Sequence, residues 1–222
     1  RQADGSAVLR IGMKSSGALG LRTRLQLPAG VAISELRAAG PDGRAESMPV
    51  RGTEPELWTP YTEGETQLIE LRTTKLPADQ TFGQLRVLSL MHFDRSPFAL
   101  ETTGDGLAKE ASGSCNVDVK CPSTIAGLDN ALAERKLSVA HLQFRSGGSG
   151  FVCTGTLINS DKFPRAFLVT ANHCISTAAE AASLTTFWFY ENVACGQRDT
   201  GTGGRVQLAG GSAMVITNYM VD

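Results

Sequence analysis

The chain has 222 residues, with 21 lysines and arginines against 22 aspartates and glutamates, and a formal net charge of −1. A charge this close to zero, without a long basic or acidic run, argues against binding to nucleic acid or to a membrane surface. Its apolar stretches are far shorter than the roughly 18 residues of a membrane-spanning helix, so no membrane insertion is expected.

Residues 7 to about 93 are predicted to form an antiparallel β-sandwich. Leucine or threonine at 19, 21, 23, 25 and 27 alternates with glycine and polar residues, the period of a strand with one buried face. A weaker alternation runs from Leu85 to Phe93, and Trp58 and His92 are assigned structural roles. Glycine, proline and aspartate clusters at 40–43, 58–60 and 76–79 are turn formers. Because the chain is long for one domain, residues 1–93 are taken as the first of two.

Residues 94–111 are polar and weakly periodic, which predicts an exposed linker before a second domain at 112–222. A helix is expected within 125–137, capped by Asp129 or Asn130, and a short one within 175–183. Strands are expected at 138–144, 151–157, 166–169, 185–190, 205–209 and 213–217. The predicted fold class is therefore all-β, with six strands forming one barrel after the sandwich.

All five cysteines lie between Cys115 and Cys195, so they belong to the second domain. Zinc is the competing interpretation. However, five residues separate Cys115 from Cys121 instead of the usual two to four, and adjacent His173 and Cys174 would rarely both reach one tetrahedral ion. Disulfides are favoured, and no metal or cofactor is expected. The odd count indicates either a missing portion of the chain or a free thiol.

Two segments of the second domain resemble a known active-site element. The strand at 166–169 leads into Thr170-Ala171-Asn172-His173-Cys174, and a Cys-Thr-Gly-Thr-Leu segment begins at Cys153, twenty residues before His173. This arrangement is similar to the histidine element of chymotrypsin-fold serine proteases. The segment Ser112 to Pro122 resembles the mature amino terminus of the bacterial lysyl endopeptidases, a secreted branch of the trypsin-like proteases. Residues 186–192, which lead to Cys195, resemble the same family's strand and third half-cystine. The resemblance covers residues 112–222.

The resemblance implies the first β-barrel of a chymotrypsin-like fold, with His173 as general base and acid. Asp222 falls where the family carries the aspartate that fixes the histidine tautomer. The implied bridges join Cys153 to Cys174 and Cys121 to Cys195, which leaves Cys115 for a cysteine beyond residue 222. His141 is expected to be a satisfied structural histidine.

The nucleophile is absent, because no Gly-Asp-Ser-Gly segment occurs in these residues. The serines at 146 and 149 lie in a glycine-rich segment that is interpreted as a flexible turn. The serine, the oxyanion hole and the specificity pocket are therefore expected from a second barrel of the same protein beyond this chain. That barrel is one predicted partner, and protein or peptide substrates are the other.

The predicted function is that of a secreted bacterial serine endopeptidase, seen as a proenzyme fragment, that cleaves after lysine or another basic residue. Residue 1 is not a start methionine, so an export signal is expected to have been removed or omitted, with the periplasm as one route. Residues 1–93 would be a pro-region, cut off between Lys109 and Glu110, or a retained binding module. Two alternatives remain open: a non-catalytic binding or adhesion module on a protease scaffold, and a secreted inhibitor or chaperone of another protease.

Overall fold

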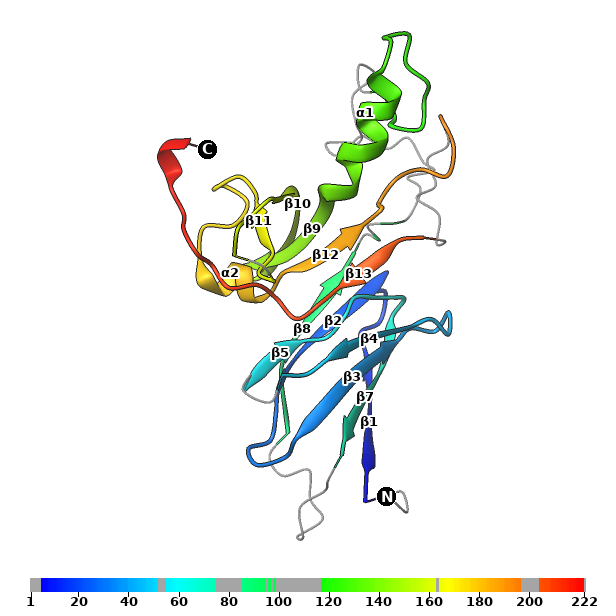
Figure 1. Ribbon diagram of the computed structural model, residues 1–222. Coiled ribbons are helices and arrows are strands. Elements are labelled where there is room, and N and C mark those ends of the chain that lie inside the picture. Colours follow the sequence, from blue (N-terminus) through cyan, green and yellow to red (C-terminus); the bar gives the residue numbers. More distant parts are fainter. Residues whose placement is uncertain are drawn as a thin grey trace.

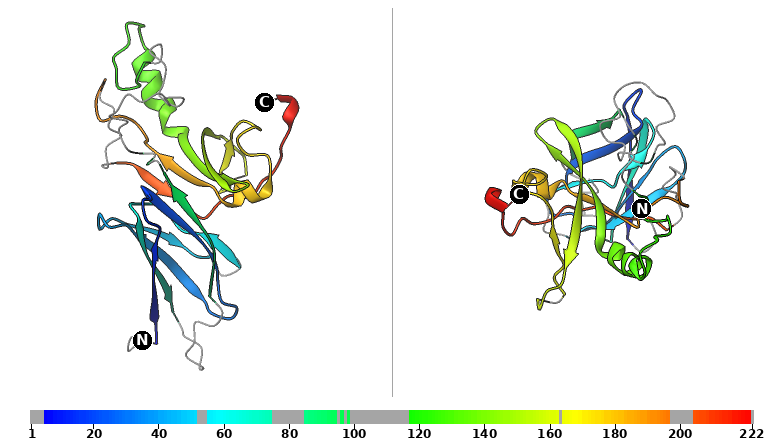
Figure 2. Two further views of the ribbon diagram at one scale, coloured as in Figure 1. Left: turned by 180° about the vertical axis from the view of Figure 1, so that it is seen from behind. Right: turned by 90° about the horizontal axis from the view of Figure 1, so that it is seen from above.

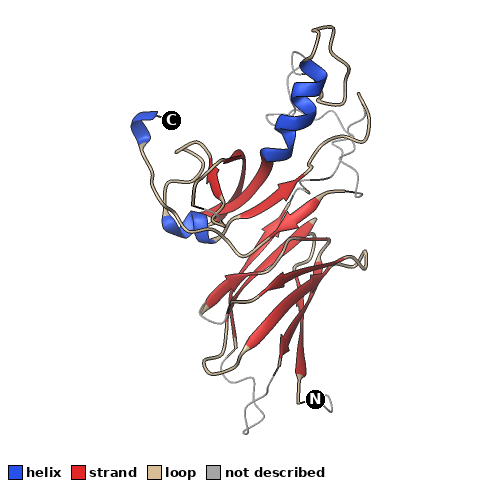
Figure 3. Ribbon diagram, in the orientation of Figure 1, coloured by secondary structure: helices blue, strands red, loops and turns tan. Residues whose placement is uncertain are grey.

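The computed structural model describes residues 5–51, 55–74, 85–94, 96, 98, 117–162, 164–196 and 204–221. It shows two β-rich units, one above the other in Figure 1. Strands dominate both, and the helices are few and short (Figure 3). None of the helices in the described ranges has the length and apolarity that a membrane span requires.

The first unit is a sandwich of two antiparallel four-stranded sheets. One sheet has the order β1-β7-β3-β4, from Ala7–Lys14, Thr66–Thr73, Ile33–Ala39 and Ala45–Pro49. In the other, β2 (Gly20–Gln26) pairs with β5 (Glu56–Trp58), β6 (Thr62–Glu63) and β8 (Arg86–Phe93). The predicted antiparallel sandwich is therefore confirmed.

The core of the sandwich follows from strand periodicity. On β2, the side chains of Leu21, Thr23 and Leu25 are fully buried, as the alternation predicts. Complete burial of a leucine side chain contributes about 1.5 to 3 kcal/mol. The Thr23 hydroxyl donates to Gln67 Oε1 at 2.8 Å, so the buried polar groups on this face are paired. Arg22, which the same alternation assigns to the exposed face, is nevertheless fully buried: its guanidinium lies over the Trp58 ring, and its Nε donates to Thr59 O.

The second unit is one antiparallel five-stranded sheet of order β11-β10-β9-β12-β13. Its strands are β9 (Val139–Ser146), β10 (Ser149–Ile158), β11 (Phe167–Val169), β12 (Thr185–Trp188) and β13 (Val206–Leu208). The apolar side chains at 140, 142 and 144 of β9 share one face and pack with Cys174 and Leu184. This order agrees with the all-β, chymotrypsin-like architecture predicted from the sequence.

The helices are peripheral, and one cap prediction is wrong. They are α1 (Leu128–Arg135), the 3-10 turn η1 (Lys136–Ser138), α2 (Ala178–Ala182) and the 3-10 turn η2 (Tyr219–Val221). The N-cap of α1 is Gly127, at φ 78°, rather than Asp129 or Asn130. Asp129 Oδ1 instead accepts from the Ser123 backbone N–H at 2.9 Å, so this carboxylate organises the preceding turn.

The predicted strand at 213–217 is also absent. Two backbone hydrogen bonds fix the residues just before this segment: Gly211 N donates to Leu184 O at 3.1 Å, and Ser212 N donates to Ala181 O at 2.8 Å. Its apolar residues face outward, with Val215 at 74% and Ile216 at 85% exposure. The alternation there is typical of a strand. A strand also needs a neighbour with free backbone groups, and none of the described strands pairs with this segment.

The two units meet where β13 lies beside the sheet of β2 and β8 (Figure 1). The Gln207 side chain makes two hydrogen bonds to the backbone of Tyr61: Tyr61 N donates to Oε1 at 2.8 Å, and Nε2 donates to Tyr61 O at 3.1 Å. The view from behind shows the same stacking of the two units (Figure 2).

Candidate active site

His173 lies in the turn that joins β11 to α2. The turn is closed by backbone hydrogen bonds from Cys174 N and Ile175 N to Ala171 O, at 3.1 and 3.3 Å. The hydroxyl of Thr170 donates to Thr154 O on β10 at 2.8 Å and so fixes the start of the turn against the sheet. The side chain of His173 is exposed, whereas that of Cys174 is buried. The turn therefore presents an imidazole to solvent from a buried anchor.

A disulfide makes that anchor covalent. Cys153 on β10 is joined to Cys174, with their Cα atoms 6.2 Å apart. A ring nitrogen of His173 and the two sulfurs all lie within 4.8 Å of one another. Both sulfurs are used in the S–S bond, so they are not the thiolates that zinc requires. The cluster therefore serves to position the imidazole.

The far end of the turn is held by the carboxylate of Glu180. It accepts hydrogen bonds from Ser146 Oγ at 2.5 Å and from the backbone N–H groups of Ser176 and Thr177, each at 2.9 Å. The Thr177 hydroxyl in turn accepts from Glu180 N at 3.2 Å, which completes a capping box for α2. These bonds, that of Ser146 first, lower the pKa of Glu180 to about 2. This network was not predicted, although Thr177-Ala-Ala-Glu180 is a capping-box pattern that can be recognised in the sequence.

The last segment of the chain returns to the same turn. After crossing α2, it brings the Thr217 hydroxyl to Asn172 Oδ1, to which it donates a hydrogen bond. In Figure 1 the segment runs past α2 before it reaches its described end. Thr217 is five residues before Asp222, and Asn172 is the neighbour of His173. Asp222 itself lies outside the described residues, so its distance from His173 stays a prediction.

Comparisons with known proteins agree with this arrangement. A family model described as "Lysyl endopeptidase, C-terminal domain" matches residues 109–222, and one described as "Lysyl endopeptidase N-terminal domain" matches residues 1–94. The chain belongs to the lysyl endopeptidase family. A curated protein named "Lysyl endopeptidase", from Pseudomonas aeruginosa, is 34% identical over 206 residues. That match covers 86% of this chain and 42% of the relative, so the chain spans less than half of the relative's length. No solved structure matches the chain.

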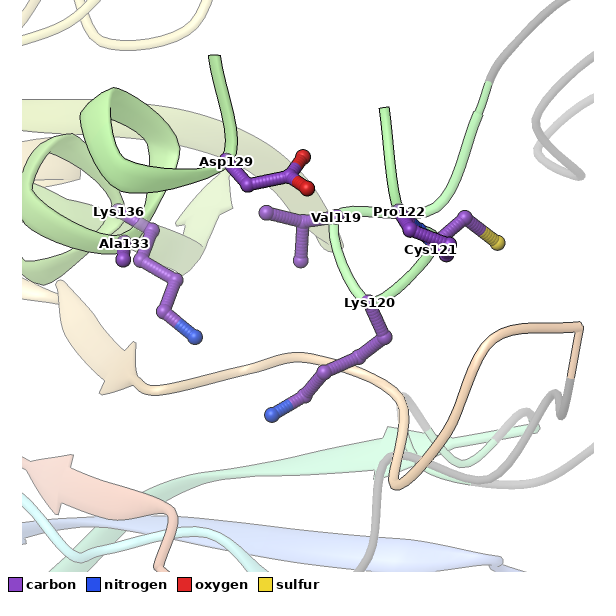
Figure 4. Close-up of a pocket in the computed structure, with 7 residues that line it drawn as sticks. All are labelled: Val119, Lys120, Cys121, Pro122, Asp129, Ala133 and Lys136. Carbon is purple, nitrogen blue, oxygen red and sulfur yellow. The ribbon is translucent and has the colours of Figure 1, made fainter. Parts of the chain in front are cut away.

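A second disulfide braces the other side of the family's C-terminal domain. Cys121 and Cys195 are joined across 74 residues of sequence, with Cα atoms 4.5 Å apart. Glu191, close to Cys195 in sequence, bridges Lys120 and Lys136 at 2.6 and 2.7 Å. A pocket of about 270 Å³ lies nearby, and Figure 4 shows the residues that line it: Val119, Lys120, Cys121, Pro122, Asp129, Ala133 and Lys136.

That pocket shares no lining residue with the turn of His173 and receives no catalytic role. Its two lysines are committed to the ion pairs with Glu191. The predicted processing residues Lys109 and Glu110, and Cys115, lie outside the described residues.

The other two histidines do not join the site. His92 Nδ1 is hydrogen-bonded to Ser15 Oγ at 2.8 Å in the first unit. His141 was predicted to be a structural histidine with its hydrogen bonds satisfied, and the second part of this prediction is wrong. Its Nε2 is buried without a hydrogen-bond partner among the described residues, and burial lowers the pKa of the ring to about 4. The residues from Ser146 to Ser149 connect β9 to β10, so the segment is a turn, as predicted. This arrangement gives no support for a serine nucleophile in the turn.

Proposed function

We propose that the complete protein is a secreted serine endopeptidase that cleaves peptide bonds after lysine, with arginine as its second choice. The observation that carries the proposal is the exposed His173, held from both sides in a chain of the lysyl endopeptidase family. A general base must keep its ring in one orientation and titrate near working pH, and histidine in a braced turn meets the first need.

In this mechanism His173 removes the proton of a serine hydroxyl while that oxygen attacks the scissile carbonyl. The imidazolium then gives the proton to the leaving amine. Asp222 accepts the Nδ1–H of His173, which fixes the tautomer and stabilises the imidazolium. The serine, the oxyanion-hole donors and the lysine pocket come from a second barrel beyond residue 222. Residues 1–222 alone are therefore expected to be inactive.

Activation proceeds by removal of the N-terminal domain. A cut between Lys109 and Glu110 leaves a new terminus that begins with glutamate. A trypsin-like switch inserts an apolar terminus into the core, and a carboxylate there would be costly to bury. Release of the sandwich is therefore the step that activates the enzyme. Two disulfides suit the oxidising environment of a secreted protein, and Cys115 completes its pair with a cysteine beyond residue 222.

The test uses the full-length protein with lysyl, arginyl and phenylalanyl amide substrates. Hydrolysis of the lysyl substrate is expected to disappear in His173→Ala and to persist in His92→Ala, the matched histidine change in the other domain. Undiminished turnover in His173→Ala would contradict the proposed role of His173 as general base. A full-length protein without a Gly-Asp-Ser-Gly segment and without reaction towards a fluorophosphonate would instead indicate a binding module on a protease scaffold.

A further inference from the structure

The surface between the two units is made, on the sandwich side, by the outer face of β2 and β8. Leu21, Thr23 and Leu25 point into the sandwich, so Arg22 lies on the opposite face of β2. Arg22 is directly opposite Met91 on β8. A methyl group added to Gly150 of β10 would lie 2.9 Å from Met91 Cε, so this face abuts the second unit.

On the side of the second unit, the surface is one face of β9 and β12. His141 and Gln143 alternate with the apolar residues that pack on Cys174, so they lie on the other face. Their cross-strand partners on β12 are Phe187 and Thr185. The Phe187 ring contacts aromatic rings of the N-terminal half, with centroid distances of 5.1 Å to Phe98 and 6.3 Å to Tyr61.

Apolar and aromatic contacts hold this surface together. Besides the rings around Phe187, the guanidinium carbon of Arg205 lies 3.4 Å from the ring centroid of Phe98. The Tyr190 ring lies 5.9 Å from that of Phe98 and, within the second unit, stacks on the imidazole of His141 with centroids 4.5 Å apart. The Gln207 side chain satisfies the backbone of Tyr61 at the edge of the contact.

The same surface buries polar groups that have no hydrogen-bond partner among the described residues. Arg22, Gln143 and Thr185 are each 0% exposed. Their unpartnered atoms, with those of the flanking residues, are Arg22 Nη1 and Nη2, Gln143 Oε1 and Nε2, Thr185 Oγ1, His141 Nε2, Ser89 Oγ and Arg205 Nη1.

Arg22 is the costliest of these groups. Its Nε donates to Thr59 O at 3.2 Å and its guanidinium lies over Trp58, but no described ion pair includes it. Burial lowers its pKa to about 9. A buried cation without an anionic partner is strongly unfavourable, and it regains water when the surface opens.

We propose that the N-terminal domain is docked on the second unit by a releasable contact, which the unpartnered polar groups, Arg22 above all, keep weak. While the linker is intact, it supplies an effective concentration of about a millimolar, which holds even a weak contact closed. All five cysteines follow the linker, so a cut there leaves no covalent tie between the domains. This inference rests on the proposed role of residues 1–93 as a removable pro-region.

The test uses the full-length protein with His173→Ala, so that it cannot process itself, and a recognition site for a site-specific protease within the linker at 99–111. After cutting, dissociation of the two pieces is measured by size-exclusion chromatography over a dilution series. The unmodified pair is expected to separate in the micromolar range. Because an added protease makes the cut, the outcome does not depend on peptidase activity.

Arg22→Met is expected to tighten the cut pair by about tenfold or more, since it removes a buried cation and keeps an apolar side chain of similar length. The matched control is Arg24→Met on the same strand face: Arg24 pairs with Glu56 at 2.5 Å and its side chain is 40% exposed, so no tightening is expected. Gln207→Ala should loosen the pair about tenfold, because it leaves Tyr61 N and O unpaired.

Thr185→Val is an independent test, because it removes only an unpartnered hydroxyl. It should lower the dissociation constant of the cut pair about threefold to tenfold. If thermal melting of the uncut protein shows that Arg22→Met does not fold, this variant carries the test. The proposal is overturned if the unmodified cut pair stays together at nanomolar concentration. It is equally overturned if neither Arg22→Met nor Thr185→Val binds more tightly than the unmodified pair.

Discussion

Replacing Glu180 by glutamine should loosen the turn of His173 in a pH-dependent way. The carboxylate accepts four hydrogen bonds, one from Ser146, two from Ser176 and one from Thr177, and its pKa falls from 4.5 to about 2. Without screening by water, a pKa shift of that size would correspond to about 3 kcal/mol of folding free energy, since each pKa unit is about 1.4 kcal/mol. Because water reaches the carboxylate and screens it, about 1 to 2 kcal/mol is the expected loss in Glu180→Gln at pH 7.

The sign of the pH dependence follows from the direction of the shift. A carboxylate whose pKa is lower in the folded state stabilises the fold fully above the unfolded value of 4.5 and loses that contribution as pH falls towards 2. Urea unfolding of the full-length His173→Ala protein, with and without the added Glu180→Gln change, should therefore show a stability gap that is widest at pH 7 and narrows below pH 4.5. Glu134→Gln, on the exposed surface of α1, is the control. Equal midpoints at pH 7, or a gap that stays constant down to pH 2.5, would refute the reasoning.

Three further outcomes are expected. Replacing both Cys153 and Cys174 by serine should cost about 3 kcal/mol by loop entropy, measured by thermal unfolding with and without reductant. The cut pair should weaken as pH falls from 6.5 towards 4, by at most about 3 kcal/mol, because His141 is neutral when docked; His141→Phe should abolish this dependence. The positive charge of Arg205 also disfavours protonation of His141. Burial raises the pKa of Glu63, so protonation of Glu63 favours the docked pair as pH falls, the opposite of the effect of His141. Comparison with His141→Phe therefore separates the contribution of the histidine from that of Glu63. In the full-length enzyme, Asp222→Asn should lower turnover on the order of ten-thousand-fold, and full activity in that variant would contradict its role.

Much of the fold is predictable from the sequence because it depends on local periodicity. The alternation on β2 identified Leu21, Thr23 and Leu25 as core, and the Val139–Ser146 and Ser149–Ile158 strands lie within a few residues of their predicted positions. The candidate site was recognisable for a different reason: the residues around His173 resemble a known family, and that resemblance, not the periodicity, supplied its disulfide partners and its role.

The failures all depend on neighbours in the fold that the local pattern does not specify. Alternation places Arg22 on an exposed face, yet the side chain is fully buried, with its guanidinium over Trp58 and its Nε bonded to Thr59 O. The segment at 213–217 has a strand's pattern but no paired neighbour among the described strands. Asp129 is a good capping residue by type, yet the turn at Ser123 uses its carboxylate, and a glycine at positive φ begins the helix. Residue type fixes what a group can do, whereas tertiary neighbours decide which option is realised.

The two faces of β9 separate the candidate active site from the proposed docking surface. Its apolar face packs on Cys174, which anchors the turn of His173, whereas its other face carries His141 and Gln143 towards the N-terminal domain. The described bonds that hold the turn come from Thr154, Ser146, Glu180 and Thr217, all within the second unit. Release of the sandwich therefore exposes one face of the strand and leaves the contacts of the histidine on the other face in place. On the proposed function, loss of the N-terminal domain would therefore leave the turn that carries His173 in place.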